Sequence, residues 1–462
     1  MGPENSHCEE YMHHSASRAH PPTFIDLFSG CGGLSLGLSQ ANWQGLFAVE
    51  KATDAFKTFN ANFLSRGARH RFRWPSWLEE RAHSIDDVLE NHRDQLKKLR
   101  GSVDLIAGGP PCQGFSFAGK RNEFDPRNKM FERYVDLVAI VRPKVLVLEN
   151  VPGMGVVHAT GARNGRGVQA GVSYYNKLLV ALEAIGYKAE GRILDASTFG
   201  VPQRRPRLVV IGLRKDVASR FDKGPASIFE KWIEESRIKL LAKLDLPERV
   251  TVKAAISDLV IGDGPTVECD DVASRRGFRM PLYKAPRTTY QRLMHDDIGR
   301  GRMDSLRLAN HSEDVLWRFA KILRECRRGV SISDHDRARL GMLKHRTVPM
   351  SPDMPAPTIT TLPDDILHYS DPRILSVREC ARIQSFPDWF TFHGKYTTGG
   401  ERRRVDCPRY TQVGNAVPPL MARVIGLGVR SALAWAESEA LKESSRVGGE
   451  RSAVAAGLAL AG

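Results

Sequence analysis

The sequence predicts an α/β protein whose main domain is a largely parallel β-sheet with helices on both faces. Three observations predict this class. Short apolar runs alternate with longer amphipathic stretches from residue 23 to residue 213. A glycine-rich segment follows the first apolar run directly, as in a strand–turn–helix unit. After residue 213 the alternation stops, and the region to about Met350 is irregular and rich in Arg, Gly and Asp, which indicates a second, smaller domain.

The individual elements follow from the apolar periodicity. Strands are expected at residues 24–28, 46–49, 103–107, 145–148 and 208–211. Helices are expected at residues 34–40, 52–63, 174–185, 312–328 and 418–437. We therefore divide the chain into a disordered leader (1–22), the main domain (23–213), the irregular domain (214–354), a segment of compact elements (355–440) and a flexible tail (441–462).

Composition narrows the class of protein. The 462 residues carry a formal net charge of +15, and the stretch from Asp271 to Met350 holds 18 Lys/Arg against 9 Asp/Glu, which favours a polyanionic partner. No apolar run approaches the roughly 20 residues of a membrane span, and the N-terminus lacks the apolar core of a signal peptide. Seven scattered cysteines without a C-x-x-C pair indicate neither a disulfide framework nor a zinc site, so we expect a cytoplasmic protein without a metal.

A small-molecule site is predicted after the first strand. There the chain reads Ser29-Gly30-Cys31-Gly32-Gly33, a turn that lets backbone approach a ligand closely. Glu50 ends the next apolar run 20 residues after Gly30, the offset at which an acid binds a ribose diol. The segment is not G-x-G-x-x-G, so a dinucleotide is not indicated. The alternative is a turn of glycines beside a surface acid.

A nucleophile is predicted after the third strand, where the chain reads GGPPCQGFS. Two prolines fix the backbone before Cys112, and the polar run that follows, to Asn128, forms a candidate lid. The alternative is an inert core cysteine. Glu149 ends the next strand, where a buried carboxyl could exchange a proton. Further on, Gln203, Arg205 and Arg207 share one face of an extended chain. Two guanidinium groups on one face require an acceptor, or else they form a structural salt-bridge cluster.

Taken in order, these segments resemble the DNA (cytosine-5)-methyltransferases, especially the compact bacterial type that acts in restriction–modification systems or alone. Seven matching segments span nearly the whole chain in the order of the family: FIDLFSGCGGLSLGL at Phe24, AVE at Ala48, GGPPCQGFS at Gly108, ENVPG at Glu149, QRRPRLVVIG at Gln203, RILSVRECARIQSFP at Arg373 and QVGNAVPP at Gln412. The resemblance implies a Rossmann-like, S-adenosylmethionine-dependent catalytic domain at 23–213. It also implies a target-recognition domain at 214–354 and a C-terminal segment at 355–440 that returns to the catalytic domain.

The resemblance also assigns roles in catalysis. Cys112 would add as a thiolate to carbon 6 of a flipped-out cytosine, Glu149 would contact ring nitrogen 3 and the amine, and Arg207, supported by Arg205, would contact O2. S-adenosyl-L-methionine would be bound by Asp26, Phe28, Gly30, Gly32, Glu50, Asn415 and Val417. Double-stranded DNA would be contacted by Gln113, Ser116, Lys120, Arg121, Arg292 and Arg300. We expect a monomer associated with the bacterial nucleoid, with a cognate restriction endonuclease as a functional partner.

Two departures from the family pattern concern the adenine. Relatives often carry an Asp that reads its amine, where this chain offers Ser84, or Asp86 in a shifted register, and an aromatic residue often follows the ribose acid, where this chain has Lys51. Two other functions remain open at this point. One is an RNA (tRNA) cytosine-5 methyltransferase on the same scaffold, and the other is a catalytically silent DNA-binding protein. A methyltransferase acting on exocyclic nitrogen would need an Asp/Asn-Pro-Pro-aromatic segment in place of GPPC.

Overall fold

The computed structural model describes residues 20–111, 130–155, 173–296, 298, 303–342, 346–397 and 406–459, with side chains to Lys442. Its centre is a six-stranded sheet in the order β2-β1-β3-β4-β6-β5. The strands are β1 (Thr23–Leu27), β2 (Gln44–Val49), β3 (Leu105–Gly108), β4 (Val145–Asn150), β5 (Tyr187–Asp195) and β6 (Pro206–Arg214). The first four strands are parallel to one another, and β6 runs antiparallel to both of its neighbours. The prediction of a largely parallel sheet is confirmed.

Helices cover both faces of this sheet, because the side chains of each strand alternate between two cores. In β3, for example, Ile106 enters one core while Leu105 and Ala107 enter the other. The first core is covered by α4 (Ile85–Asn91), α5 (Arg93–Lys98), α6 (Met130–Val141) and α7 (Tyr174–Ala184). The second is covered by α2 (Gly33–Gln40), α3 (Thr53–Phe63) and the long α17 (Pro419–Ala459).

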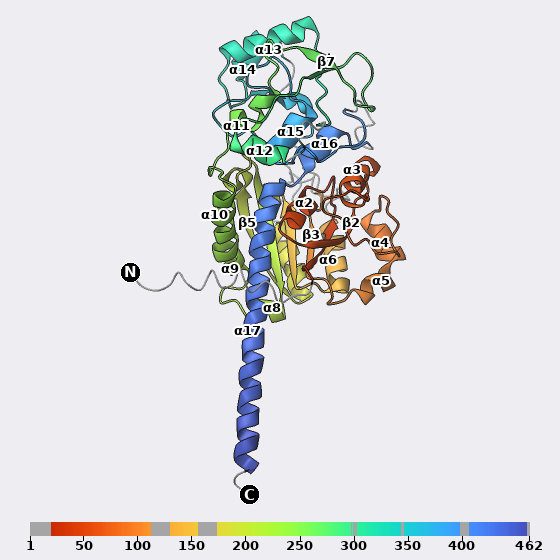
Figure 1. Cartoon of the computed structure of the whole chain (residues 1–462), viewed down its shortest axis with the longest axis vertical. Coiled ribbons are helices and arrows are strands. Elements are labelled where there is room, and N and C mark those ends of the chain that lie inside the picture. Colours follow the sequence, from red (N-terminus) through yellow and green to blue (C-terminus); the bar gives the residue numbers. More distant parts are fainter. Residues whose placement is uncertain are drawn as a thin grey trace, which may run out of the picture.

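The C-terminal helix α17 packs against α2, the first helix after the glycine turn. The contact is close because a Cβ atom on Gly37 would lie 2.4 Å from both Ala422 Cβ and Pro419 O. Figure 1 shows α17 running along the sheet and continuing beyond it. The helix was expected to end near Glu437, but it extends to Ala459, through most of the segment 441–462 that we took as a flexible tail. The absence of proline from residues 438–459, together with five Ala and three Glu, allows this extension despite three Gly.

The first elements after β6 still pack against the unit that contains the six-stranded sheet. The elements α8 (Lys215–Ala218), α9 (Pro225–Ser227), the π-helical η5 (Ile228–Ile233) and α10 (Glu234–Lys243) follow one another. Of these, η5 and α10 pack on α17, where Trp232 and Trp435 have ring centroids 6.0 Å apart. Residues 215–243 therefore lie with the sheet, although the boundary at residue 214 assigned them to the second domain. Apolar helical periodicity does not reveal which core a helix joins.

The remaining elements form a second unit above the sheet (Figure 1). Its helices are α11 (Val252–Ile256), α12 (Thr289–His295), α13 (Glu313–Glu325), α14 (Asp334–Arg339), α15 (Val377–Ile383) and α16 (Arg409–Asn415). Two small sheets pair β7 (Thr266–Glu268) with β8 (Arg279–Pro281), and β9 (Val348–Pro349) with β10 (Ile366–Leu367). Of the short 3₁₀ turns, η6 (Ser257–Leu259) and η7 (Pro363–Asp365) belong to this unit, whereas η3 (Pro152–Gly155) and η4 (Ala196–Phe199) lie in the sheet unit.

The core of the second unit contains buried ion pairs. Arg382 of α15 is fully buried and binds Asp258 at 2.9 Å and Asp388 at 2.6 Å. Because a buried cation requires full compensation, these two carboxylates fix α15 in one orientation. The arginines of the segment at Arg373 are therefore structural in part.

Candidate active site

The carboxyl ends of the parallel strands gather the predicted site residues at one edge of the sheet. The glycine turn follows β1, Glu50 follows β2, Gly109 and Pro110 follow β3, and Glu149 lies near the end of β4. Because β6 is antiparallel, its beginning, with Arg207, lies at this same edge. Ligands of open parallel sheets bind at this edge.

Glu149 and Arg207 form an ion pair there. The distance from Arg207 Nε to Glu149 Oε1 is 2.8 Å, and the two side chains are only 11% and 12% exposed. Gly109 lies directly against this pair, because a Cβ atom added to it would be 3.4 Å from Glu149 Oε2. The site thus combines a carboxylate and a guanidinium in a partly desolvated position, where charge–dipole interactions are stronger than in water.

The backbone that leads into the cysteine segment is fixed beside the same pair. The side-chain amide Nδ2 of Asn150 donates a hydrogen bond of 3.1 Å to the carbonyl of buried Pro110, and Gly109 N donates to Leu27 O at 3.3 Å. Sequence reasoning gave Asn150 no role. Its signal was its position at the end of a strand, directly after Glu149. Five predicted residues of the cysteine segment lie outside the described residues: Cys112, Gln113, Ser116, Lys120 and Arg121.

Arg205 does not join the Glu149–Arg207 ion pair. Its side chain is buried and donates hydrogen bonds to three main-chain carbonyls, those of Ile359 (3.1 Å), Gly414 (2.8 Å) and Ala416 (3.1 Å). Burial, together with the neighbouring charge of Arg207, lowers the pKa of Arg205 well below its ordinary value. The guanidinium therefore connects the start of β6 to the segment around Asn415.

The turn after β1 is organised around Glu50. Its carboxylate accepts hydrogen bonds from Gly30 N at 2.9 Å and Ala52 N at 2.6 Å. Burial raises the pKa of Glu50, and these two amide donors oppose the shift. Phe28, Gly30 and Gly32 have φ angles of 60°, 57° and 98°, and a Cβ atom on Gly30 would meet open space. The turn thus presents backbone and a fixed carboxylate toward an open region, as a nucleoside ligand requires.

Asp26 precedes the turn and lies within strand β1. It is fully buried and accepts a hydrogen bond of 2.6 Å from Ser35 Oγ on α2, while its Oδ1 has no partner among the described residues. Burial raises the pKa of Asp26 to about 7. The side chain contacts α2 and supports the glycine turn from behind.

The C-terminal motif reaches the same turn. A Cβ atom on Gly33 would lie 2.3 Å from Val417 O, and the Cys31 thiol lies 3.6 Å from Gln412 O. Asn415 is exposed at the end of α16, and Val417 is buried. The structure therefore brings Asn415 and Val417 beside the residues that follow β1.

The two adenine-site alternatives differ in their surroundings. Ser84 Oγ caps α4 by accepting a hydrogen bond of 3.0 Å from Asp87 N, and the preceding residue, His83, donates its N–H to Glu50 O at 2.9 Å. Asp86 is half exposed and pairs with Arg133 at 2.8 Å. Ser84 is thus one residue from the Glu50 contact, whereas Asp86 is engaged in a surface ion pair.

Of the DNA-contact predictions in the second unit, Arg292 is exposed on α12. Its guanidinium donates to Arg287 O at 3.0 Å and Thr289 Oγ1 at 3.3 Å. Arg300 lies outside the described residues.

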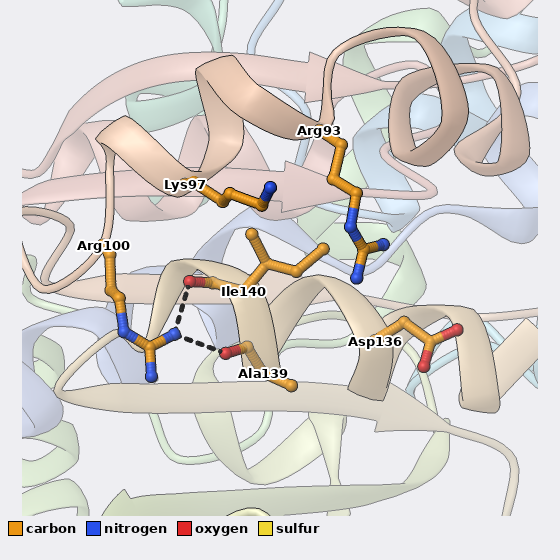
Figure 2. Close-up of a pocket in the computed structure, with 6 residues that line it drawn as sticks. All are labelled: Arg93, Lys97, Arg100, Asp136, Ala139 and Ile140. Carbon is orange, nitrogen blue, oxygen red and sulfur yellow. Dashed lines mark hydrogen bonds between the residues drawn. The ribbon is translucent and has the colours of Figure 1, made fainter.

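A shallow pocket elsewhere on the sheet unit contains none of these residues. Figure 2 shows it between α5 and α6, where Arg100 donates to the carbonyls of Ala139 and Ile140 at 2.9 Å. Its rim carries Arg93, Lys97 and Asp136. The loop at Arg100 precedes β3, so this pocket lies toward the opposite edge of the sheet from Glu149.

Within the described part of the chain, no group of three His, Cys, Asp or Glu residues is arranged to hold a metal ion. One helical stretch, Arg409–Lys442, is long and apolar enough to cross a membrane by length and composition. This stretch includes α16 and the first part of α17. In its most apolar window 67% of the residues are buried inside the protein, as expected for a core helix that packs on α2.

The sheet, the glycine turn and the carboxylate after β2 define a Rossmann-like domain of the S-adenosylmethionine-dependent methyltransferase class. Comparison with known proteins identifies the family. The chain belongs to the C-5 cytosine-specific DNA methylases, whose family model matches residues 22–429. It is a DNA (cytosine-5) methyltransferase.

Individual relatives agree with this assignment. The chain is 30% identical to the type II methyltransferase M.DdeI of Desulfomicrobium norvegicum, over 87% of this chain and 86% of the relative. It is 31% identical to the type II methyltransferase M.XorII of Xanthomonas oryzae pv. oryzae, over 89% and 85%. Among solved structures, a prophage-encoded E. coli protein described as a DNA modification methyltransferase shares the fold, with a TM-score of 0.58, 24% identity and coverage of 89% and 99%.

Proposed function

We propose that this methyltransferase modifies a specific cytosine in double-stranded DNA through a covalent Cys112 adduct on a base turned out of the helix. The Glu149–Arg207 ion pair is the observation that carries the proposal, because it lies against Gly109, three residues before Cys112. A cytosine ring placed at this pair would meet a carboxylate and a guanidinium at the carboxyl edge of the sheet. The base must leave the stack to reach such a site, at a cost of a few kcal/mol.

The residues of the chain supply the chemistry in a defined order. The Cys112 thiolate forms a bond to carbon 6, and the 5,6 double bond supplies the electron pair that makes carbon 5 nucleophilic. Glu149 holds a proton at ring nitrogen 3, and Arg207 stabilises the charge that develops on O2. After carbon 5 has gained the methyl group it loses its proton to solvent, and the electron pair left behind expels Cys112 and restores the double bond.

The cofactor-binding residues fit S-adenosyl-L-methionine. Glu50 offers carboxylate oxygens to a ribose diol, and the turn leaves open space for a ligand at Gly30, while Gly32 packs against Phe63. Phe28 precedes the turn, while Asn415 and Val417 close the pocket from the C-terminal side. When bound, the cofactor supplies an electrophilic methyl group. Asp26 would act from behind the turn, through Ser35 on α2.

Arg205 is proposed as a positioning residue that supports Arg207. Its hydrogen bonds to Gly414 O and Ala416 O hold the backbone on both sides of Asn415. On the DNA, we propose contacts from Gln113, Ser116, Lys120, Arg121, Arg292 and Arg300. We further propose that the protein acts as a monomer, alone or with a cognate restriction endonuclease, in the bacterial nucleoid.

The test is adduct trapping on DNA that contains 5-fluorocytosine, because fluorine at carbon 5 cannot leave as a proton. Bisulfite sequencing of DNA from cells that express the enzyme first identifies its site. Wild-type enzyme should then form a denaturation-resistant complex with fluorinated DNA of that sequence, and Cys112→Ala should form none and transfer no methyl group. Cys326→Ala is the matched control, because this cysteine lies in the core of the second unit and should not affect trapping. Methylation by Cys112→Ala at the wild-type rate would refute the mechanism.

A further inference from the structure

Arg307 of the second unit is stacked between two aromatic rings. Its guanidinium carbon lies 4.1 Å from the centroid of the Phe278 ring and 3.8 Å from that of the Tyr396 ring. Two rings this close to one carbon, without contact between them in the described structure, must occupy opposite faces of the guanidinium. The plane of the guanidinium is therefore fixed, and its N–H groups point outward from the edge of the stack.

This guanidinium has no hydrogen bond or ion pair within the described ranges. It is half-buried, and burial lowers the pKa of Arg307. Arg409 provides the contrast, because its guanidinium carbon lies 4.5 Å from the same Tyr396 ring but it also forms an ion pair with Asp271. The Tyr396 hydroxyl donates to the same carboxylate at 2.7 Å. One of the two stacked arginines is thus neutralised, while the other is oriented and has no acceptor among the residues that the structure describes.

The stack lies close to the reaction site. Arg409 is the first residue of α16 and Asn415 is the last, so the two lie roughly 9 Å apart along the helix axis at 1.5 Å per residue. Asn415 belongs to the segment beside the glycine turn, and Arg409 is in contact with the Tyr396 ring that also holds Arg307. The stack is therefore one short helix, α16, away from the segment that lies beside the glycine turn.

We propose that Arg307 determines sequence specificity by donating two hydrogen bonds to O6 and N7 of a guanine in the major groove, next to the target cytosine. Guanine presents two acceptors side by side on its major-groove edge, which match the fork of a guanidinium. Fixing the plane of that fork favours recognition of a base edge, since the edge has one orientation. A phosphate contact has no such requirement, and a flexible, exposed Lys or Arg meets it. This inference rests on the proposed function.

The test uses the full-length enzyme and a duplex library randomised around the target cytosine, read by bisulfite sequencing. Arg307→Lys keeps the charge but loses the planar fork, and Arg307→Ala loses both. Both variants should lose the preference for guanine at one and the same position. The ratio of methylation with guanine there to methylation with any other base there should fall about 10-fold to 100-fold. Phe278→Leu, which frees one face of the guanidinium, should weaken the same preference to a smaller extent.

Arg324→Ala is the matched control, since this arginine lies on α13 with its side chain 74% exposed and should keep the wild-type preference. An equal loss on all sequences, with rescue by Arg307→Lys, would assign Arg307 to a phosphate and overturn the proposal. Unchanged preferences in both Arg307 variants would also overturn it. Neither result would contradict the covalent mechanism. The Arg307 variants would still methylate DNA and would still form the denaturation-resistant complex with fluorinated DNA through Cys112.

Discussion

At the scale of single residues, Glu149 and Arg207 form an ion pair in a partly desolvated position. The function of each residue therefore depends on the other. Arg207→Lys keeps a positive charge but removes the planar donor beside the carboxylate. We expect kcat to fall by about 10²-fold to 10³-fold, the usual effect of removing a preorganised donor, with little change in KM for the cofactor. Arg214→Lys is the control on the same strand, because Arg214 pairs with Asp216 at the far end of β6. Single-turnover methyl transfer measures both variants. An unchanged rate in Arg207→Lys would remove the arginine from the mechanism.

Asp26 predicts a pH dependence of stability. Burial raises its pKa from 3.8 to about 7, so the native protein retains a proton that the unfolded chain has released. The contribution of Asp26 is therefore most favourable below about pH 4, and it declines as the pH rises to about 7. A shift of this size corresponds to about 4 kcal/mol. In Asp26→Asn this decline should be absent, so the variant should gain stability relative to wild type between pH 5 and pH 8. Urea unfolding at several pH values checks the sign, and parallel curves for the two proteins would contradict it.

At the scale of elements, Arg205 connects the start of β6 to the segment at α16. Arg205→Met keeps much of the volume but removes the hydrogen bonds that the guanidinium donates to the carbonyls of Ile359, Gly414 and Ala416. Hydrogen bonds to a charged group are worth about 1.5–3 kcal/mol each, so the unfolding free energy should fall by several kcal/mol. Because Gly414 and Ala416 flank Asn415, KM for S-adenosylmethionine should rise about 10-fold, whereas Arg207→Lys should affect kcat. Arg204→Met, at the exposed neighbouring position, loses a single hydrogen bond, the one to Gly329 O at 3.1 Å, so it should lower the unfolding free energy much less and leave KM unchanged. Equal effects at positions 204 and 205 would contradict this division of roles.

The elements also show what the sequence could predict. Five strands were expected from apolar runs, and all five are present, because a strand buried on both faces is apolar throughout. The strand β5, with the sequence YKAEGRILD, lies at the sheet edge and was missed because it is not a continuous apolar run: Lys188, Glu190 and Arg192 alternate with its apolar residues. Alternation predicted that Gln203, Arg205 and Arg207 share one face, but it could not reveal that Arg205 bonds carbonyls near Asn415. Those partners are far away in the chain and depend on the return of the C-terminal segment.

At the scale of the whole molecule, the family and the enzyme class could be predicted because their motifs lie in order along the chain, and both predictions are confirmed. The Phe278–Arg307–Tyr396 stack could not be predicted, because its members come from three irregular segments without periodicity. The same irregular region carries much of the net charge of +15, which concerns the last prediction.

An enzyme with this excess of basic residues should bind DNA with a strong dependence on salt. Each phosphate that Lys or Arg neutralises releases condensed counterions, so the logarithm of the binding constant falls linearly with the logarithm of the salt concentration. With roughly six to ten phosphate contacts, DNA affinity should fall by about 10³-fold to 10⁵-fold between about 50 mM and 200 mM salt. Fluorescence anisotropy with a labelled duplex measures this slope. Binding of S-adenosylmethionine, followed by calorimetry over the same range, is the internal control and should change little, because the contact proposed for Glu50 is short-range. If the two ligands responded equally to salt, the basic surface would not be a phosphate-binding surface, and the charge of the second unit would need another explanation.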